Sequence, residues 1–162
     1  MGRLFPTAGM KVFIGAAKQF ADTDFVLADF TGGTPTWTEV KGTTNIGGFG
    51  DESQLISSEH VGSARTRKTK GTRNAGQMAL VCDLDYADPG QIALLAAEKT
   101  RDSYAFKVVL NDAPAGGTPS ERYFTAFVMS AREEFGGPNQ AMQMNATLEI
   151  DSNIVRVVAD EA

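Results

Sequence analysis

Residues 77–85 read QMALVCDLD, and this stretch shows the clearest two-residue alternation in the sequence. Successive side chains of a β-strand point to opposite faces, so residues two apart share a face. One face is apolar and holds Met78, Leu80, Cys82 and Leu84, and the other holds Gln77, Ala79, Val81, Asp83 and Asp85. The stretch therefore predicts a strand with one face in the core and the other in contact with water.

A second stretch, residues 140–150, repeats the pattern nearer the end of the chain. Its two faces are Met142, Met144, Ala146, Leu148 and Ile150 against Ala141, Gln143, Asn145, Thr147 and Glu149. We expect the first set to lie in the core. The other faces of both stretches are too polar to build a second core, so we expect them to contact water.

The segment between these strands carries the signals of one helix. Asp88 is a good N-cap, and Pro89 suits the first helical position. The apolar residues Ile92, Leu95 and Ala96 follow at helical spacing and predict the buried side. We expect the helix to end near Lys99.

The rest of the chain reads as short strands joined by turns. We predict strands at 11–16, 37–40, 104–111, 122–135 (bent) and 154–158, a bulged strand at 43–50, and one arm of a hairpin at 54–60. Residues 17–36 are mixed and end in a turn-rich loop. Many strands and one helix predict a mainly β fold, a β-sandwich or open barrel with the helix packed over an open end or edge. The length of 162 residues, without repeat or linker, predicts one domain over residues 1–162.

A basic segment interrupts an otherwise acidic chain of net charge −5. No acidic residue occurs between Glu59 and Asp83, and this gap holds Arg65, Arg67, Lys68, Lys70 and Arg73. Residues 62–76 lack an apolar face and hold three glycines, which predicts a long exposed loop or an extended arm. Such a segment can bind nucleic acid, dock on the acidic surface of an identical neighbour, or remain a solvated loop.

The composition speaks against catalysis. His60 is the only histidine and Cys82 the only cysteine, which excludes an intramolecular disulfide and a cysteine-based zinc site. Asp83 and Asp85 form either half of a metal site or part of a wet sheet face. We therefore expect no enzyme, no cofactor and no metal. No apolar run approaches the ~18–20 residues of a membrane helix, so we also expect no membrane insertion.

The order of these features resembles the major tail tube proteins of long-tailed, non-contractile bacteriophages, over about residues 11–158. The resemblance rests on the Gly-rich residues 46–50 before SSEH, the basic arm SARTRKTKGTRNAG, the strand QMALVCDL, the capped helix in DYADPGQIALLAAEKT, the strand YAFKVVLND, and the hairpin FTAFVMSAREEFGGPNQAMQMNATLEID. Residues 17–36 depart from it, because they are longer than the short first hairpin expected. The fold is also similar to contractile-tail tubes and the type VI secretion tube, and a phage-derived particle such as a gene transfer agent is equally compatible.

The resemblance implies a structural protein that forms hexameric rings, which stack into a hollow tube for DNA delivery. It implies as partners the chain itself, a tape-measure protein, a tail terminator, a distal tail protein, and translocating DNA without specific binding. The implied location is the virion tail, after assembly in the host bacterial cytoplasm. On this basis we expect Asp83, Asp85, Gln143, Asn145, Thr147 and Glu149 to face the lumen, and Arg65, Arg67, Lys68, Lys70 and Arg73 to contact the next ring.

Two alternatives belong to other classes of function. The first alternative is a soluble β-sandwich that binds a ligand such as a carbohydrate, with the polar face as its solvent side, although Trp37 is the only tryptophan available for an aromatic platform. A tube protein of a contractile or type VI-like secretion apparatus is the other alternative.

Overall fold

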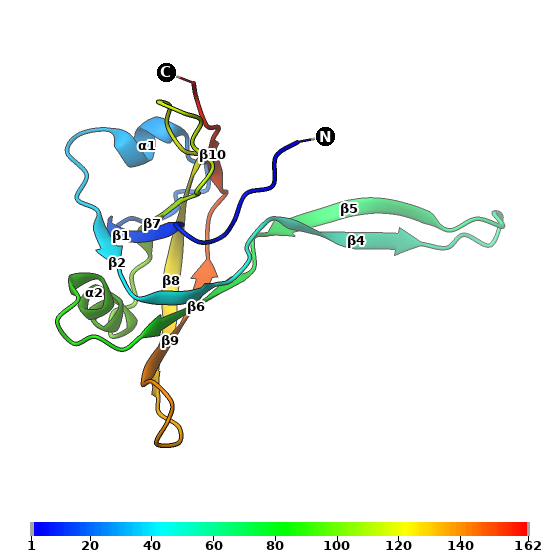
Figure 1. The fold of residues 1–162 in the computed structure, drawn as a ribbon. Helices are drawn as coiled ribbons and strands as arrows, with labels where there is room; N and C mark the ends of the chain where they lie inside the picture. Colours follow the sequence, from blue (N-terminus) through cyan, green and yellow to red (C-terminus); the bar gives the residue numbers. More distant parts are fainter. Residues whose placement is uncertain (1, 162) are drawn as a thin grey trace.

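The computed structural model describes residues 2–161 and consists of a β-rich body with one long hairpin projecting from it (Figure 1). No helix in this range is long and apolar enough to cross a membrane. The elements are β1 (Lys11–Ala17), α1 (Leu27–Thr31), β2 (Thr38–Val40), β3 (Thr43–Ile46), β4 (Glu52–Ser58), β5 (Arg67–Asn74), β6 (Gln77–Asp83), α2 (Pro89–Glu98), β7 (Tyr104–Val109), β8 (Glu121–Glu134), β9 (Gln143–Ile150) and β10 (Val155–Val157).

The body is one antiparallel sheet that bends along β8. Its strand order is β2-β1-β7-β8-β9-β6-β3, and β10 pairs with β8 beside this path. The first part of β8 pairs with β7 and β10, and its second part pairs with β9. A register shift between Val128 and Ser130 marks a bulge, which bends a strand and increases its twist. The two end strands, β2 and β3, are joined by the short connection Lys41–Gly42, so the predicted open barrel is confirmed.

The apolar faces predicted for β6 and β9 form the centre of the core. Met78, Leu80, Cys82, Met144 and Leu148 are fully buried there. Met142 does not belong to this set. It is 51% exposed, because β9 begins only at Gln143, so the prediction that Met142 lies in the core is wrong.

The helix α2 begins where the sequence predicts, but it buries a different side. The Asp88 carboxylate accepts a hydrogen bond from the Gln91 amide, and Pro89 is the first residue. The buried residues are Gly90, Gln91, Leu94 and Ala97, whereas Ile92 is 51% exposed and Leu95 is half-buried. The predicted buried side is therefore wrong for Ile92 and Ala96, whereas Leu95 packs in part against the core as expected. A Cβ on Gly90 would collide with the Glu39 carbonyl oxygen, so β2 is too close for any other residue here.

A polar cluster explains why that side faces inward. The buried Gln91 amide group donates to the carbonyls of Lys41 and Asp83, and its oxygen accepts from the Asp85 amide. The Asp88 carboxylate also accepts from the Lys41 amide. These bonds tie the helix to the β2–β3 connection and to the end of β6. They satisfy backbone groups that would otherwise be buried without partners.

Residues 17–36 contain a second helix, so the prediction of a single helix is wrong. The five-residue α1 brings Phe30 onto the outer face of the sheet, where it stacks on Tyr123 at 5.5 Å between ring centroids. Phe25 and Trp37 join this second apolar cluster. The cluster includes Ala105 of β7 and Tyr123 of β8, which alternate with Phe106 and Phe124 of the main core and so lie on the opposite face. The ribbon shows α1 beside β10 (Figure 1).

The strands β4 and β5 form the projecting hairpin, which we call the arm. The sequence allows a loop or an extended arm for residues 62–76, and the loop is wrong for Arg67–Asn74, which form a strand. The flanking strands β3 and β6 pair with each other, so the arm is an insertion within one hairpin of the body. Its root is held by an ion pair of 2.7 Å between Arg73 and Asp51.

Candidate assembly surfaces

The sheet formed by β8, β9, β6 and β3 has a polar side opposite the core. The register places Asp83 beside Gln143, Val81 beside Asn145, Ala79 beside Thr147, and Gln77 beside Glu149. On the other side of β9, Glu134 lies beside Gln143, Arg132 beside Asn145, and Ser130 beside Thr147. We define the polar face by Gln77, Asp83, Ser130, Arg132, Glu134, Gln143, Asn145, Thr147 and Glu149.

The structure brings together five of the six residues predicted for a lumen. Asp83, Gln143, Asn145, Thr147 and Glu149 share the polar face, and the four on β9 are half-buried and alternate with buried residues from Met144 to Ile150. Asp85 lies elsewhere, because β6 ends at Asp83. The Asp85 carboxylate accepts a hydrogen bond from the Ala87 amide in the turn before α2. The two-residue spacing between Asp83 and Asp85 predicts a shared strand face, but the strand ends before Asp85.

Sequence reasoning missed Arg132, Glu134 and Ser130 on this face. The sequence predicts a strand at 122–135, but the bulge after Val128 decides which of its residues share a side with Glu149. No residue type in this part of the sequence predicts the bulge. With Asp83, Glu134 and Glu149 against Arg132, the polar face has three acidic residues and one basic residue.

The polar face ends at two strand edges. Beyond Ala126 the strand β8 leaves β7 and pairs with β9 alone, so its outer edge up to Glu134 has no strand partner among residues 2–161. At the opposite side the last strand is β3, which is four residues long. Unpaired edges offer backbone N–H and C=O groups to another chain.

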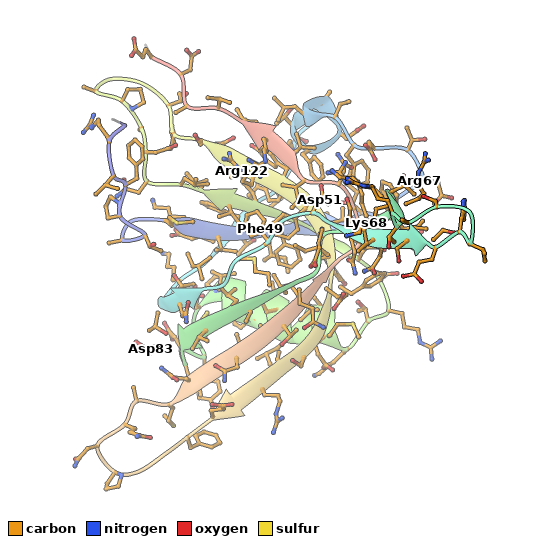
Figure 2. The ribbon with its side chains drawn as sticks, turned by 90° about the vertical axis from the view of Figure 1, so that its right-hand side faces the viewer. Phe49, Asp51, Arg67, Lys68, Asp83 and Arg122 are labelled. Carbon is orange, nitrogen blue, oxygen red and sulfur yellow. The ribbon has the colours of Figure 1, made fainter. Side chains whose placement is uncertain are left out.

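The arm projects from the body (Figure 1) and carries the predicted basic residues, of which Arg67 and Lys68 are labelled in Figure 2. Four of them, Arg67, Lys68, Lys70 and Arg73, lie on β5, and Arg65 lies in the turn before it. The arm also exposes Leu55, Ile56 and Val61, of which Leu55 is 68% exposed. Arg73 differs from the rest, because it forms the ion pair with Asp51 at the root. Exposed aliphatic and cationic side chains on a projecting hairpin are suited to contact with another molecule.

The groups with shifted pKa values are structural. Burial raises the pKa of the Cys82 thiol to about 11, and the nearby carboxylates of Asp88 and Asp83 add to the shift. Burial and a hydrogen bond to Glu121 raise the pKa of Tyr123. The Ser120 hydroxyl and backbone amide donate to Asp112 and lower the pKa of that carboxyl. His60 is exposed in a loop of the arm. Such scattered groups do not form a nucleophile with a base.

Comparison with known proteins agrees with this arrangement of sheet and arm. Residues 31–159 match the family model of the phage tail tube protein, TTP, so the chain belongs to the phage tail tube protein family. This match confirms the resemblance to phage tail tube proteins. No curated protein sequence matches the chain.

Solved structures with a similar fold come from phage tails and from contractile injection systems. The SPP1 tail tube is 15% identical, with a TM-score of 0.61, and 93% of this chain matches 78% of that chain. The sheath/tube terminator structure of the extracellular contractile injection system PVC contains a chain that is 12% identical, with a TM-score of 0.68 and coverage of 97% and 99%. The six-fold symmetrised baseplate structure of the anti-feeding prophage contains one that is 10% identical, with a TM-score of 0.66 and coverage of 98% of both chains.

Proposed function

We propose that the chain assembles into hexameric rings that stack into a hollow tail tube, through which DNA passes into a host cell. The observation that carries this proposal is the polar face, which lies on one side of a sheet whose other side is fully buried. Membership of the tail tube family supports it. The polar face lines the lumen in this proposal.

Ring formation uses the two strand edges that border the polar face. The outer edge of β8 in one copy pairs with the edge at β3 in the next, which continues the sheet from copy to copy. A strand edge that is paired in the assembly no longer exposes its backbone groups. Rings formed in this way have no free edge around the lumen.

The charge of the polar face suits a conduit for DNA. A cationic wall would hold DNA through phosphate contacts and counterion release. The polar face has three acidic residues and only Arg132 as a cation, so it repels phosphate weakly and offers few contacts that would slow the DNA. In this proposal tape-measure protein occupies the lumen before DNA does, and terminator and distal tail proteins close the two ends of the tube.

Stacking uses the arm, which docks on the acidic body of a copy in the next ring. This is a contact between two different surfaces, and such contacts generate open filaments. Arg65, Arg67 and Lys68 lie at the outer part of the arm and are free of the ion pair at its root. They provide the cationic part of the docking surface, and the assembled tube is part of the virion tail.

A tube inside a contractile apparatus is a second candidate, because a chain in the sheath/tube terminator structure of the contractile injection system PVC has a similar fold. In that case the outer side of the body would contact a sheath. Co-expression with candidate sheath proteins distinguishes the two, since only this second function requires a sheath around the tube.

Negative-stain electron microscopy of the purified protein tests the main proposal. The parent chain should form rings or tubes, and Arg65→Glu/Arg67→Glu/Lys68→Glu should remain folded but fail to stack. A matched control, Lys41→Glu/Lys99→Glu/Arg101→Glu, makes the same change in net charge on exposed body residues and should still stack. A parent chain that stays monomeric at all concentrations would contradict the proposal. Normal stacking by the arm variant would contradict the role of the arm.

A further inference from the structure

A groove on the outer side of the body is open and mostly apolar. It lies between the segment around α1 and the far end of β1, and its volume is about 160 Å³. Its lining is Gly15, Ala16, Ala17, Phe30, Gly32, Pro35, Trp37 and Ala105, together with the polar residues Lys18, Asp29 and Thr36. For comparison, an apolar cavity of about 150 Å³ accommodates a benzene ring. The groove is therefore large enough for one aromatic side chain.

The strand edge beside the groove is also free. β2 pairs with β1 only at Val12, Phe13 and Ile14, so the outer edge of β1 from Gly15 to Ala17 has no strand partner within residues 2–161. Gly15 and Ala17 themselves line the groove. An extended peptide that adds to such an edge gains backbone hydrogen bonds, and alternate side chains fill neighbouring pockets.

The chain itself contains an extended segment with exposed apolar side chains, residues 2–6. Leu4 is 97% exposed and Phe5 is 56% exposed, and residues 2–6 belong to no helix or strand. Pro6 restricts Phe5 to an extended backbone, so little conformational freedom is lost when the segment binds as a strand. Arg3 lies two residues before Phe5, and the rim of the groove carries one carboxylate, Asp29, which also accepts from the Val26 amide, and one ammonium group, Lys18.

The segment does not reach the groove of its own molecule. The Asn111 side chain donates to the Ala8 carbonyl at 2.6 Å, and the Met10 amide donates to the Thr7 carbonyl, which fixes the chain just before β1. From there residues 2–6 run away from the body on the side opposite α1, and both views agree on this (Figures 1 and 2). The groove also lies at the other end of β1.

We propose that the groove receives the N-terminal segment of a second copy of the chain, with Phe5 seated against the half-buried Trp37. The inference rests on the proposed assembly into a tube. It adds a contact on the outer side of the body that involves neither the polar face nor the arm. Aromatic side chains in edge or offset contact contribute beyond the area they bury.

Cysteine cross-linking tests the contact directly, because the native Cys82 is buried and its raised pKa keeps it protonated. Leu4→Cys in one preparation and Pro35→Cys in another are mixed before assembly and then oxidised. A disulfide-linked dimer is expected in the assembled tubes. The matched control pairs Leu4→Cys with Gly137→Cys, which is at the β8–β9 turn and has no neighbour within 4 Å of an added Cβ. Equal cross-linking in both mixtures, or none with Pro35→Cys, would overturn the inference.

The single tryptophan gives a second readout. In parent tubes the acrylamide quenching constant of Trp37 should be about twofold lower than in tubes of Phe5→Ser, because Phe5 closes the open side of the indole. Phe5→Leu should restore most of the protection. Equal quenching in parent and Phe5→Ser tubes would overturn the contact while leaving tube assembly intact. A parent chain that forms no tubes would overturn the proposed function as well, so the two failures are distinguishable.

Discussion

The arm and the β6–β9 pair are both antiparallel strand pairs, but only the second shows alternating side chains. In β9 every second residue from Met144 to Ile150 is buried, whereas seven of the eight residues of β5 are exposed. The difference follows from packing, because a strand alternates only when its own chain covers one of its faces. Absence of alternation therefore does not exclude a strand. In a strand of mostly polar residues such as β5, it indicates that neither face is covered within the molecule.

The largest difference between the two regions is expected on removal of an aliphatic side chain. Leu148→Ala in β9 should lower the free energy of unfolding by about 2–5 kcal/mol, because it leaves a cavity in the core. Leu55→Ala in the arm should change it by less than about 0.5 kcal/mol. Chemical denaturation of both unassembled variants measures this. Similar losses at the two positions would mean that the arm packs on the body in solution.

Two glycines give the next contrast. Gly90→Ala should cost about 1–3 kcal/mol, because the new Cβ collides with the backbone of β2 at Glu39 and Val40. Gly62→Ala in the arm has open space around it and should be neutral or slightly stabilising. Thermal unfolding of both variants checks the prediction. An unaffected Gly90→Ala would show that α2 can move away from β2 at little cost.

Two carboxylates give a smaller contrast. Asp88→Ala should cost about 1 kcal/mol or somewhat more, because Asp88 both caps α2 and accepts from the Lys41 amide. Asp51→Ala removes the exposed ion pair with Arg73 and should cost at most about 1 kcal/mol. Raising the salt concentration should reduce the second loss much more than the first. An equal salt effect on both would contradict this explanation.

The smallest expected effect concerns the pH dependence of stability. The Cys82 thiol has a pKa of about 11 in the folded chain against an ordinary value of 9.0, so its contribution is complete below pH 9. It is lost as the pH rises toward 11, because the unfolded chain releases this proton first. The fall in stability over that range should be shallower in Cys82→Ala than in the parent chain.

The reactivity of thiols gives a related contrast between the two regions. The cysteine of Ser57→Cys in the arm should react readily with a thiol reagent at about pH 8, whereas the buried Cys82 should not.

Features that depend on one face of one element could be predicted from the sequence. The strand predicted at 77–85 is confirmed over Gln77–Asp83, and the cap formed by Asp88 and Pro89 is confirmed, because alternation and capping are local effects. The buried side of α2 could not be predicted from apolar spacing. The buried side is set by two residues. Gly90 permits close approach to β2, and the polar Gln91 is buried because its side chain forms hydrogen bonds with three backbone groups.

The misses elsewhere have similar causes. The Val26 side chain does not cap α1, although the Asp29 carboxylate accepts a hydrogen bond from the Val26 amide. The buried Phe30 of this helix packs on Tyr123, which is 93 positions away in the sequence. On the polar face, the alternation of β9 predicts four residues correctly. The positions of Arg132 and Glu134 on this face depend on the bulge in β8, which the sequence does not predict. The roles in a lumen and between rings stay predictions, because they concern contacts between copies.

The insertion of the arm between β3 and β6 has an evolutionary consequence. The two strands that flank it hold each other in register through Thr43 and Cys82 and through Ile46 and Leu80, whatever is placed between them. Doubling the length of a loop costs only about 0.6 kcal/mol in closure entropy. Natural selection can therefore lengthen or shorten the arm, or replace its charged residues, with little change in the stability of the body. Arm and body are separate modules, and the reach of one can diverge among relatives while the architecture of the other is retained.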